Sequence, residues 1–210
     1  MHLIGKVFQG GTPGMMKLRT LVALSAVSVL AACTTAPPPP PRAPVVVQPR
    51  SVAPPTNYRW TNGFSEKGYE AMFATFGKVR LRPGEFHLLP AAAHPAEGDV
   101  AITVDIANQI AFVFKGESLI GVTNISTGKK GHPTPLGFWT INWKKPKYFS
   151  RKYDNAPMPW IQNIDDKGIA FHGGVTPGYP ASHGCIRLPM TFAKQLYGIT
   201  KVGNKVVIEG

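Results

Sequence analysis

Apolar and polar residues alternate with the two-residue period of β-strands through much of the second half of the chain. The runs with this pattern lie at 100–106, 109–115, 117–126, 138–143, 169–171 and 205–208. The first three follow one another with only short turns between them, which predicts an antiparallel meander. We therefore expect the last half of the chain to form a domain that is mainly β.

Two segments carry the three- and four-residue spacing of amphipathic helices instead. Ser65 is a suitable N-cap for a helix over 66–76, and Gly77 would end that helix. Its expected apolar face consists of Tyr69, Met72, Phe73 and Phe76. A second helix is predicted after Pro189, a residue that suits the first turn, and Gly198 would stop it.

Residues 144–168 show neither period. They are basic and aromatic, and they include Pro146, Pro157 and Pro159. Loops of this length inside a compact domain are usually functional, as lids or binding loops, so a structureless binding loop is expected here. His87 and His94 stand alone in loop-like sequence and are interpreted as surface residues.

The N-terminal part of the chain has the pattern of an export signal. Lys17 and Arg19 precede a short apolar stretch, which is followed by small residues. This arrangement is typical of a signal peptide, predicted over residues 1–32, whose true start would be Met15 or Met16. No apolar run has the length of an ordinary transmembrane helix, which excludes a polytopic membrane protein.

The end of the predicted signal peptide resembles the lipobox of bacterial lipoproteins. The matching residues are Leu30-Ala31-Ala32-Cys33. In such proteins the cysteine thiol is acylated and becomes the new N-terminus, which would attach this chain to a membrane at Cys33. The alternative is an ordinary signal peptide cut near Ala32. Thr34, rather than an aspartate, follows the cysteine, which favours the outer membrane.

A proline-rich segment follows the expected lipid anchor. Residues 33–57 hold nine of the 21 prolines of the chain. Such a segment favours the extended polyproline II conformation and cannot build a core, so it is predicted to be a semi-rigid spacer. The expected organisation is a signal peptide at 1–32, a lipidated linker at 33–57, a small helical lead-in at 58–98 and the catalytic domain at 99–210.

The net charge of the chain limits the classes of binding partner to expect. The chain has 23 Lys and Arg residues against 11 Asp and Glu residues, a formal net charge of +12. Loss of residues 1–32 removes three cations and no acid, which leaves +9. An exported protein meets little nucleic acid, so the expected neighbours are anionic envelope polymers and lipid headgroups; a generally solvated basic surface is the alternative.

The candidate chemistry lies between residues 171 and 188. His172, His183 and Cys185 lie within this segment, and the only other cysteine is Cys33. A free thiol in an exported protein is a candidate nucleophile, because a nearby imidazole can accept its proton and the resulting ion pair favours the thiolate. An extended chain would place His183 and Cys185 on one face, and the intervening loop could return His172 to the thiol.

Gly184 would let the backbone approach a substrate carbonyl closely. The N–H groups of Gly184 and Cys185 could then form an oxyanion hole just before a helix N-terminus. Three other interpretations stay open at this point. Cys185 could be a buried core residue, the glycines could only make a turn, or His172, His183 and Cys185 could bind zinc, although no fourth ligand is visible.

A family signature is visible in this segment. His172-Gly173 is followed by the run Ser182-His183-Gly184-Cys185-Ile186-Arg187. This pattern resembles that of the L,D-transpeptidase catalytic domain family, also called YkuD-like, and residues 126–128 and 134–138 resemble the family's hairpin that precedes the site. The resemblance covers about residues 99–210. It implies a mainly β, sandwich-like fold with a short helix after the catalytic cysteine.

The resemblance also implies a cysteine-dependent acyl transfer on peptidoglycan stem peptides. Cys185 would attack the carbonyl of the third stem residue and release the terminal D-alanine. The thioester would then pass to an amine, giving a 3-3 crosslink or attachment to a protein. No metal or organic cofactor is implied.

Site roles follow from the same resemblance. His172 would be the general base, oriented by the carbonyl of Gly173, and Gly184 with Cys185 would supply the oxyanion N–H groups. His183 and Ser182 would shape the site. The expected substrate-binding residues are Ser182, Arg187, Trp160 and Tyr179.

Two alternative functions remain. Water could replace the amine acceptor, which would make the protein an L,D-carboxypeptidase or a hydrolase of crosslinks. The chain could also be a non-catalytic peptidoglycan-binding lipoprotein, although a binding protein has no need of a free thiol. All of these hypotheses place the protein in the cell envelope, facing the periplasm.

Overall fold

Strands dominate the part of the chain that the computed structural model describes, residues 62–210. The predicted signal peptide, Cys33 and the proline-rich linker lie outside the described residues. The helical elements are α1 (Phe64–Phe76), the 3₁₀ turn η1 (Ala91–Ala93) and α2 (Met190–Ile199). The strands are β1 (Phe86–Leu88), β2 (Val100–Asp105), β3 (Ile110–Lys115), β4 (Ser118–Asn124), β5 (Gly137–Thr140), β6 (Trp143–Lys145), β7 (Phe149–Ser150), β8 (Ala156–Pro157), β9 (Ile161–Asn163), β10 (Ala170–Gly173), β11 (Ile186–Leu188) and β12 (Lys205–Glu209). Neither helix of this described part is long and apolar enough to span a bilayer.

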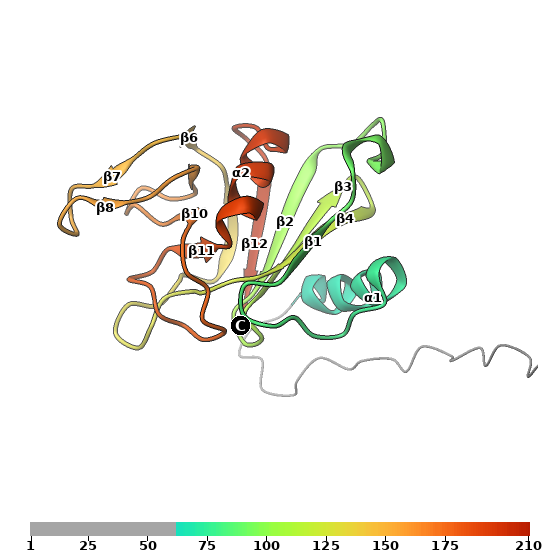
Figure 1. Ribbon diagram of the computed structural model, residues 1–210, viewed down its shortest axis with the longest axis horizontal. Coiled ribbons are helices and arrows are strands. Elements are labelled where there is room, and N and C mark those ends of the chain that lie inside the picture. The colour runs from blue at the N-terminus through green and yellow to red at the C-terminus, as the bar shows by residue number, and fades with distance from the viewer. Residues whose placement is uncertain (1–61) are drawn as a thin grey trace, which may run out of the picture. The chain divides into compact units, whose positions relative to one another are not determined.

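The strands form two main sheets and one short hairpin (Figure 1). The large sheet has the order β1-β4-β3-β2-β12-β5, the small sheet has the order β11-β10-β9-β6, and β7 pairs with β8. In the large sheet β2, β3 and β4 pair antiparallel in succession, which confirms the predicted meander. The last strand, β12, pairs parallel with β2 and antiparallel with β5.

The main hydrophobic core lies between the two sheets and encloses α2, as Figure 1 shows. The large sheet contributes Ile102 and Val113, the small sheet contributes Phe171 and Ile186, and α2 contributes Phe192. Burial of these apolar side chains is the main favourable contribution to the folding of this domain. The small sheet is therefore held rigidly on its inner face, and its outer face remains available for a site.

Helix α1 covers part of the outer face of the large sheet. Tyr69 and Met72, both predicted on its apolar face, are buried against Phe112 of β3. The Tyr69 hydroxyl also donates to a carboxylate oxygen of Asp105 at 2.7 Å. The apolar stripe read from the sequence thus anchors α1 to the sheet.

The start of α1 differs from the prediction. The helix begins at Phe64 after Gly63, and Ser65 lies within its first turn, so Ser65 is not the N-cap. A carboxylate from the end of β12 supplies the cap: Glu209 accepts hydrogen bonds from the N–H groups of Asn62 and Ser65. Sequence reasoning missed this cap because its partner lies almost 150 residues away in the chain.

The end of α2 also differs from the prediction. The helix continues through Gly198 and ends at Ile199. The ammonium group of Lys144 donates to the carbonyl oxygens of Tyr197 and Thr200, which satisfies acceptors that the end of a helix leaves free. A glycine stop is not needed where a lysine from another element caps the helix.

Residues 138–168 are more structured than expected. The single strand predicted at 138–143 is two strands, β5 in the large sheet and β6 in the small sheet. The chain changes sheets where the N–H of Ile141 donates to Asn204 and that of Asn142 donates to Asn163. The predicted structureless loop contains the β7–β8 hairpin and β9, which are too short to show a period in the sequence.

The segment expected to be only a helical lead-in also contains a strand. β1 pairs antiparallel with β4 at the edge of the large sheet. His87, expected in a loop, lies in this strand, and its ring is 3.1 Å from a carboxylate oxygen of Glu85.

Candidate active site

The predicted nucleophile lies at the start of the edge strand of the small sheet. Cys185 directly precedes β11, which pairs parallel with β10 so that Phe171 is opposite Ile186 and His172 is opposite Arg187. Phe171 and Ile186 point into the main core. Because side chains alternate along strands, His172 of β10 and Arg187 of β11 lie on the other, outer face of the small sheet. Cys185 lies on that face as well, because it packs against Ala170, two residues before His172 in β10.

A small apolar cluster surrounds the thiol on this face. Met158, Ile161 and Ala170 form its buried part, and Cys185 packs against them, partly buried. The sulfur atom lies 3.5 Å from the carbonyl oxygen of Gly168. The segment predicted to be a binding loop, residues 144–168, therefore forms the wall of the thiol site.

The environment of Cys185 favours the neutral thiol. Burial raises the pKa of the thiol, and the nearby carboxylate of Asp165 raises it further. A hydrogen bond with the backbone of Ala170 and the charge of Arg187 act in the opposite direction on this pKa. Desolvation is the largest of these effects, so the resting group is a thiol.

His172 is held as a neutral base. Its side chain is only 9% exposed, and its Nδ1 lies 3.0 Å from the carbonyl oxygen of Gly173. A carbonyl can only accept, so Nδ1 carries the proton and Nε2 is left free to accept one. Burial, assisted by Arg187, lowers the pKa of His172, although the bond to Gly173 opposes this shift.

The directions of these two pKa shifts do not favour the expected thiolate–imidazolium ion pair. Both Cys185 and His172 favour their neutral forms, because the buried outer face of the small sheet solvates charge poorly.

The motif segment bends instead of running extended. Gly184 has a φ of +115°, a value that favours glycine, and the chain turns through residues 183–185. The prediction that an extended chain presents His183 and Cys185 on one face is therefore wrong. His183 is exposed and stacks on Tyr153 with ring centroids 4.7 Å apart, and His132 meets it edge-on at 4.8 Å.

Ser182 changes the expected oxyanion hole. Its hydroxyl oxygen accepts the N–H of Gly184 at 3.0 Å and donates to the carbonyl of Cys185. The N–H of Gly184 is thus engaged within the loop, and the predicted pair of donors reduces to the N–H of Cys185. β11 also lies between Cys185 and α2, so the thiol is not directly before a helix N-terminus as predicted.

Residues 126–128, which the resemblance had singled out, brace this loop. Ser126 and Arg187 exchange both backbone hydrogen bonds, and the N–H of Ser182 donates to the carbonyl of Thr127. Gly128 packs so closely that a Cβ there would lie 3.0 Å from Cα of Gly184 and even closer to a carbonyl oxygen. Only glycine lets the two segments approach this far.

Two side chains outside the predicted site residues support the same loop: Thr134, within the 134–138 segment that the resemblance singled out, and Gln109, which sequence reasoning missed. The side chain of Thr134 donates to the carbonyl of Gly184 at 2.7 Å and accepts the N–H of Gly128. The amide of Gln109 bonds to both the backbone N–H and the hydroxyl of Thr127. The available signal for Gln109 was a polar residue at the start of the apolar run 109–115.

The predicted substrate-binding residues do not all gather at the thiol. Arg187 does, because its side chain lies over Gly174 and its charge acts on both His172 and Cys185. Tyr179 is 62% exposed on the loop before the motif, where its carbonyl accepts from Ser126.

Trp160 packs away from the thiol cluster. Its ring contacts Tyr197 of α2 at 5.6 Å and belongs to the border of the main core. The neighbouring Ile161 faces the thiol instead. The contacts of Trp160 do not support the expected place in the donor groove. Its backbone has a left-handed φ of +57° just before β9 begins at Ile161.

The three residues that were considered as zinc ligands, His172, His183 and Cys185, do not come together either. Within residues 62–210, no group of three His, Cys, Asp or Glu side chains is arranged to hold a metal ion. His183 points to solvent and stacks on Tyr153, while His172 is buried on the small sheet.

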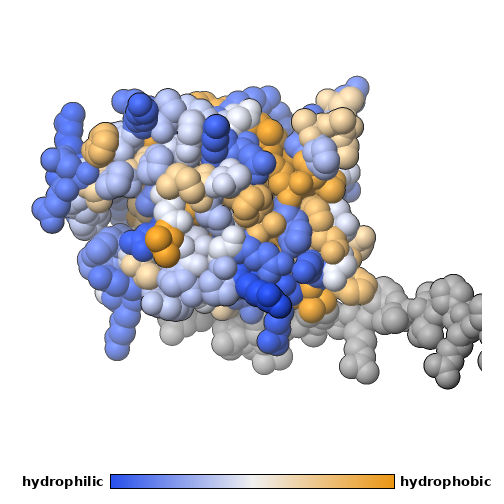
Figure 2. All heavy atoms as spheres, viewed as in Figure 1, coloured by the Kyte–Doolittle hydropathy of each residue, from blue (hydrophilic) through white to orange (hydrophobic). Residues whose placement is uncertain are grey.

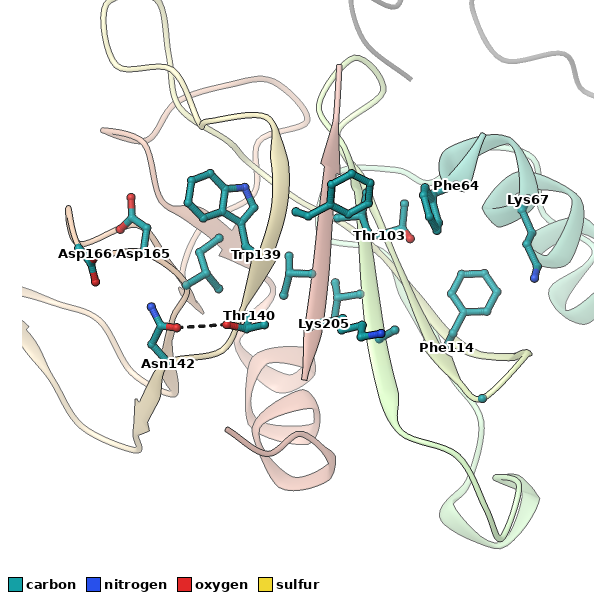
Figure 3. Close-up of a pocket in the computed structure, with 17 residues that line it drawn as sticks. Phe64, Lys67, Thr103, Phe114, Trp139, Thr140, Asn142, Asp165, Asp166 and Lys205 are labelled. Atoms are coloured by element: carbon teal, nitrogen blue, oxygen red, sulfur yellow. Dashed lines mark hydrogen bonds between the residues drawn. The ribbon is translucent and has the colours of Figure 1, made fainter. Parts of the chain in front are cut away.

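A separate groove of about 750 Å³ lies on the outer face of the large sheet (Figure 3). Phe64 and Phe114 lie at one end of it, and Asp165 and Asp166 lie at its other end. None of the lining residues belongs to the His172–Arg187 motif. This groove is thus distinct from the thiol site.

Comparisons with known proteins agree with this arrangement. The sequence profile of the L,D-transpeptidase catalytic domain (YkuD) matches residues 99–208. An L,D-transpeptidase (Yku) from Stackebrandtia nassauensis is a similar solved structure, with 28% identity, a TM-score of 0.50, and coverage of 56% of this chain and 58% of that one. A comparison with curated protein sequences finds no significant match.

Two mycobacterial structures show the same fold. An L,D-transpeptidase from Mycobacterium smegmatis has 22% identity and a TM-score of 0.50, and the match covers 53% of this chain and 59% of that one. An L,D-transpeptidase from Mycobacterium tuberculosis H37Rv has 20% identity and a TM-score of 0.50, and the match covers 53% of this chain and 57% of that one. This chain spans somewhat more than half the length of these relatives. From the profile match over more than half of its residues, the chain belongs to the L,D-transpeptidase catalytic domain (YkuD) family.

Proposed function

We propose that this protein is a peptidoglycan L,D-transpeptidase that uses Cys185 as its nucleophile and His172 as its general base. The observation that carries the proposal is that Cys185 packs against Ala170 of β10, the strand that also carries His172, with Nδ1 of His172 bound to Gly173. This arrangement leaves Nε2 as the acceptor for the thiol proton. Family membership supports the same chemistry.

The first half-reaction forms a thioester. Sulfur of Cys185 attacks the carbonyl carbon of the third residue of a tetrapeptide stem, and its proton passes to Nε2 of His172. The N–H of Cys185 is the donor available to the developing oxyanion. When the tetrahedral intermediate collapses, the C–N bond to the terminal D-alanine breaks, and the imidazolium returns the proton to the leaving amine.

The second half-reaction transfers the acyl group. An amine of a second stem, or of a protein, attacks the thioester carbonyl while His172 accepts its proton. The C–S bond then breaks, the thiol is restored, and a new amide remains. The low pKa of His172 keeps the imidazole neutral and able to act in both half-reactions near pH 7.

We further propose that the enzyme works in the cell envelope, held at the outer membrane by an acyl chain on Cys33 and facing the periplasm. Support comes from the lipobox-like run that ends at Cys33 and from the net charge of +9 left after removal of residues 1–32. Labelling of intact cells with a fatty acid tests the anchor: label should enter the wild-type protein and be absent from Cys33→Ala.

Intact-mass analysis tests the reaction. The chain without residues 1–33, in which Cys185 is the sole thiol, is incubated with a disaccharide-tetrapeptide, with and without excess D-amino acid. Loss of D-alanine and exchange for the added amino acid are expected, together with a transient acyl-enzyme mass. Cys185→Ala is the matched control, and turnover retained by this variant would refute the proposal.

The same experiment separates the acceptors. Loss of D-alanine without exchange identifies water as the acceptor and makes the protein an L,D-carboxypeptidase. The absence of any reaction, with Cys185 unmodified, contradicts the enzymatic proposal.

A further inference from the structure

Two segments that meet the exposed end of the motif carry exposed cationic side chains. We call Lys129, Lys130, Arg151 and Lys152 the basic rim. The ion pairs of the described residues involve Lys67, Lys78, His87 and Lys201, and no member of the basic rim belongs to one. Exposed cations that are left unpaired beside an active site are available to an anionic ligand.

Two segments bring the basic rim to His183. The backbone N–H of Lys129 donates to the carbonyl of Ser182 at 3.0 Å, so the backbone of Lys129 lies beside the motif. The ring of Tyr153 stacks on His183 with an interplanar angle of 30°. The ammonium nitrogen of Lys152 lies 5.4 Å from the centre of the Tyr153 ring.

The β7–β8 hairpin that carries Arg151 and Lys152 forms one end of the described domain (Figure 1). Figure 2 shows strongly hydrophilic side chains projecting from this end. The hairpin is anchored at the base, because the N–H of Met158 donates to the carbonyl of Tyr148. Its charged turn therefore has a defined place next to the motif.

Acidic groups offset little of this charge. Asp154 is the one acid in the hairpin turn. Asp165, on the other side of the thiol, is engaged by the N–H groups of Lys167 and Ile169. The pKa of His183 is lowered, first by desolvation and then by the nearby positive groups Lys129, His132 and Arg187.

We infer that the basic rim is a binding subsite for free carboxylates of the peptide substrate. The inference rests on the proposed function, which supplies a peptide stem as the ligand of the adjacent thiol. A peptide bound at Cys185 extends past the motif, and its carboxylates would there meet Lys129 on one side and Lys152 on the other. Lysines act as flexible point charges, so they contribute to affinity and encounter rate more than to geometry.

Binding to an inactive variant gives the direct test. The full chain with Cys185→Ala is titrated with a stem tetrapeptide that has free carboxylates and with the same peptide fully amidated. The free acid should bind about five-fold more weakly after Lys129→Ala and Lys152→Ala are combined, from two exposed charge contacts. The amidated peptide should lose no affinity, and added salt should weaken the free acid less in the variant.

A matched control removes the same charge elsewhere. Lys67→Ala with Lys205→Ala takes two cations from the outer face of the large sheet, and the affinity for the free acid should stay within two-fold of the parent. An equal loss of affinity for the free and the amidated peptide would overturn the inference. An equal loss of affinity in the two double variants would overturn it too. Preferential binding of a phosphate-rich wall polymer over the peptide would overturn it as well.

A failure of the carboxylate subsite can be distinguished from a failure of the proposed acyl transfer. Alkylation of Cys185 by neutral iodoacetamide, followed by the mass of the peptide that contains Cys185 so that Cys33 is not counted, should proceed at the same rate with and without the rim substitutions. An equal rate excludes damage to the site as the cause of weaker binding. Binding is measured without turnover, so a failure of acyl transfer leaves the carboxylate test valid.

Discussion

His172 combines two constraints in one side chain. Its bond to the carbonyl of Gly173 fixes the proton on Nδ1, and burial keeps the ring neutral. The protonated ring would be further disfavoured by the cation of Arg187 on the same face. Position and protonation state are thus both set before any substrate binds.

The pH dependence of acylation follows from these shifts. Because the folded-state pKa of His172 is lowered from its usual 6.5, the acid limb of kcat/KM should lie below pH 6.5. Arg187→Gln removes one cause of the lowering and should move this limb to higher pH. A limb above pH 6.5 in the wild type, measured by D-alanine release, would contradict the assignment.

The same shift has a consequence for stability. Unfolded chains take up a proton on His172 at its usual pKa, whereas the folded chain resists protonation. The contribution of neutral His172 to the free energy of unfolding is therefore complete above pH 6.5. It is lost as the pH falls through the lower folded-state pKa. Activity and stability should decline over the same acidic range.

At the scale of elements, Lys144 ties β6 to the end of α2. Its ammonium group reaches the carbonyls of Tyr197 and Thr200 as well as the Thr200 hydroxyl, and it lies 4.0 Å from the centre of the Tyr197 ring. Burial lowers the pKa of Lys144. A cation at a helix C-terminus also interacts favourably with the helix dipole.

Lys144→Met should destabilise the fold without touching the site. Methionine keeps the apolar stem but leaves the carbonyls at the end of α2 without their donor, which should lower the free energy of unfolding by about 2 kcal/mol. Urea unfolding measures the change. Lys147→Met, at an exposed position, is the control, and equal effects of the two substitutions would refute the capping role.

At the scale of the whole described domain, Glu209 joins its first helix to its last strand. The carboxylate is fully buried and accepts the N–H groups of Asn62 and Ser65 at the start of α1. A negative group at a helix N-terminus satisfies free donors and the dipole together. The two ends of the domain therefore stabilise each other.

Glu209→Ala should lower the free energy of unfolding by about 2–3 kcal/mol, because buried donors lose a charged acceptor. Hydrogen exchange should locate the loss in α1, while thioester formation by the folded protein stays unchanged. Glu117→Ala removes an exposed acid whose contact with Lys67 is 3.9 Å, and should change stability by less than about 0.5 kcal/mol. Loss of activity at full folding would contradict this separation of roles.

Local patterns in the sequence were sufficient to predict much of this protein. The meander of β2, β3 and β4, the apolar face of α1 and the position of α2 follow from side-chain periodicity, which depends only on neighbours along the chain. The motif from His172 to Arg187 was equally visible, because its residue types and order indicate thiol chemistry without any fold.

Contacts between distant residues were decided only by the tertiary structure. The cap on α1 comes from Glu209, and the cap on α2 comes from Lys144. The N–H of Gly184 is taken by Ser182 because the loop bends, and the bend depends on bracing by residues 126–128. Burial, and with it the neutral state of His172 and Cys185, likewise depends on which segments cover the small sheet. Sequence alone determined which groups could react; the fold decided their protonation, their orientation and which donors remain free, because these properties arise from packing between segments far apart in the chain.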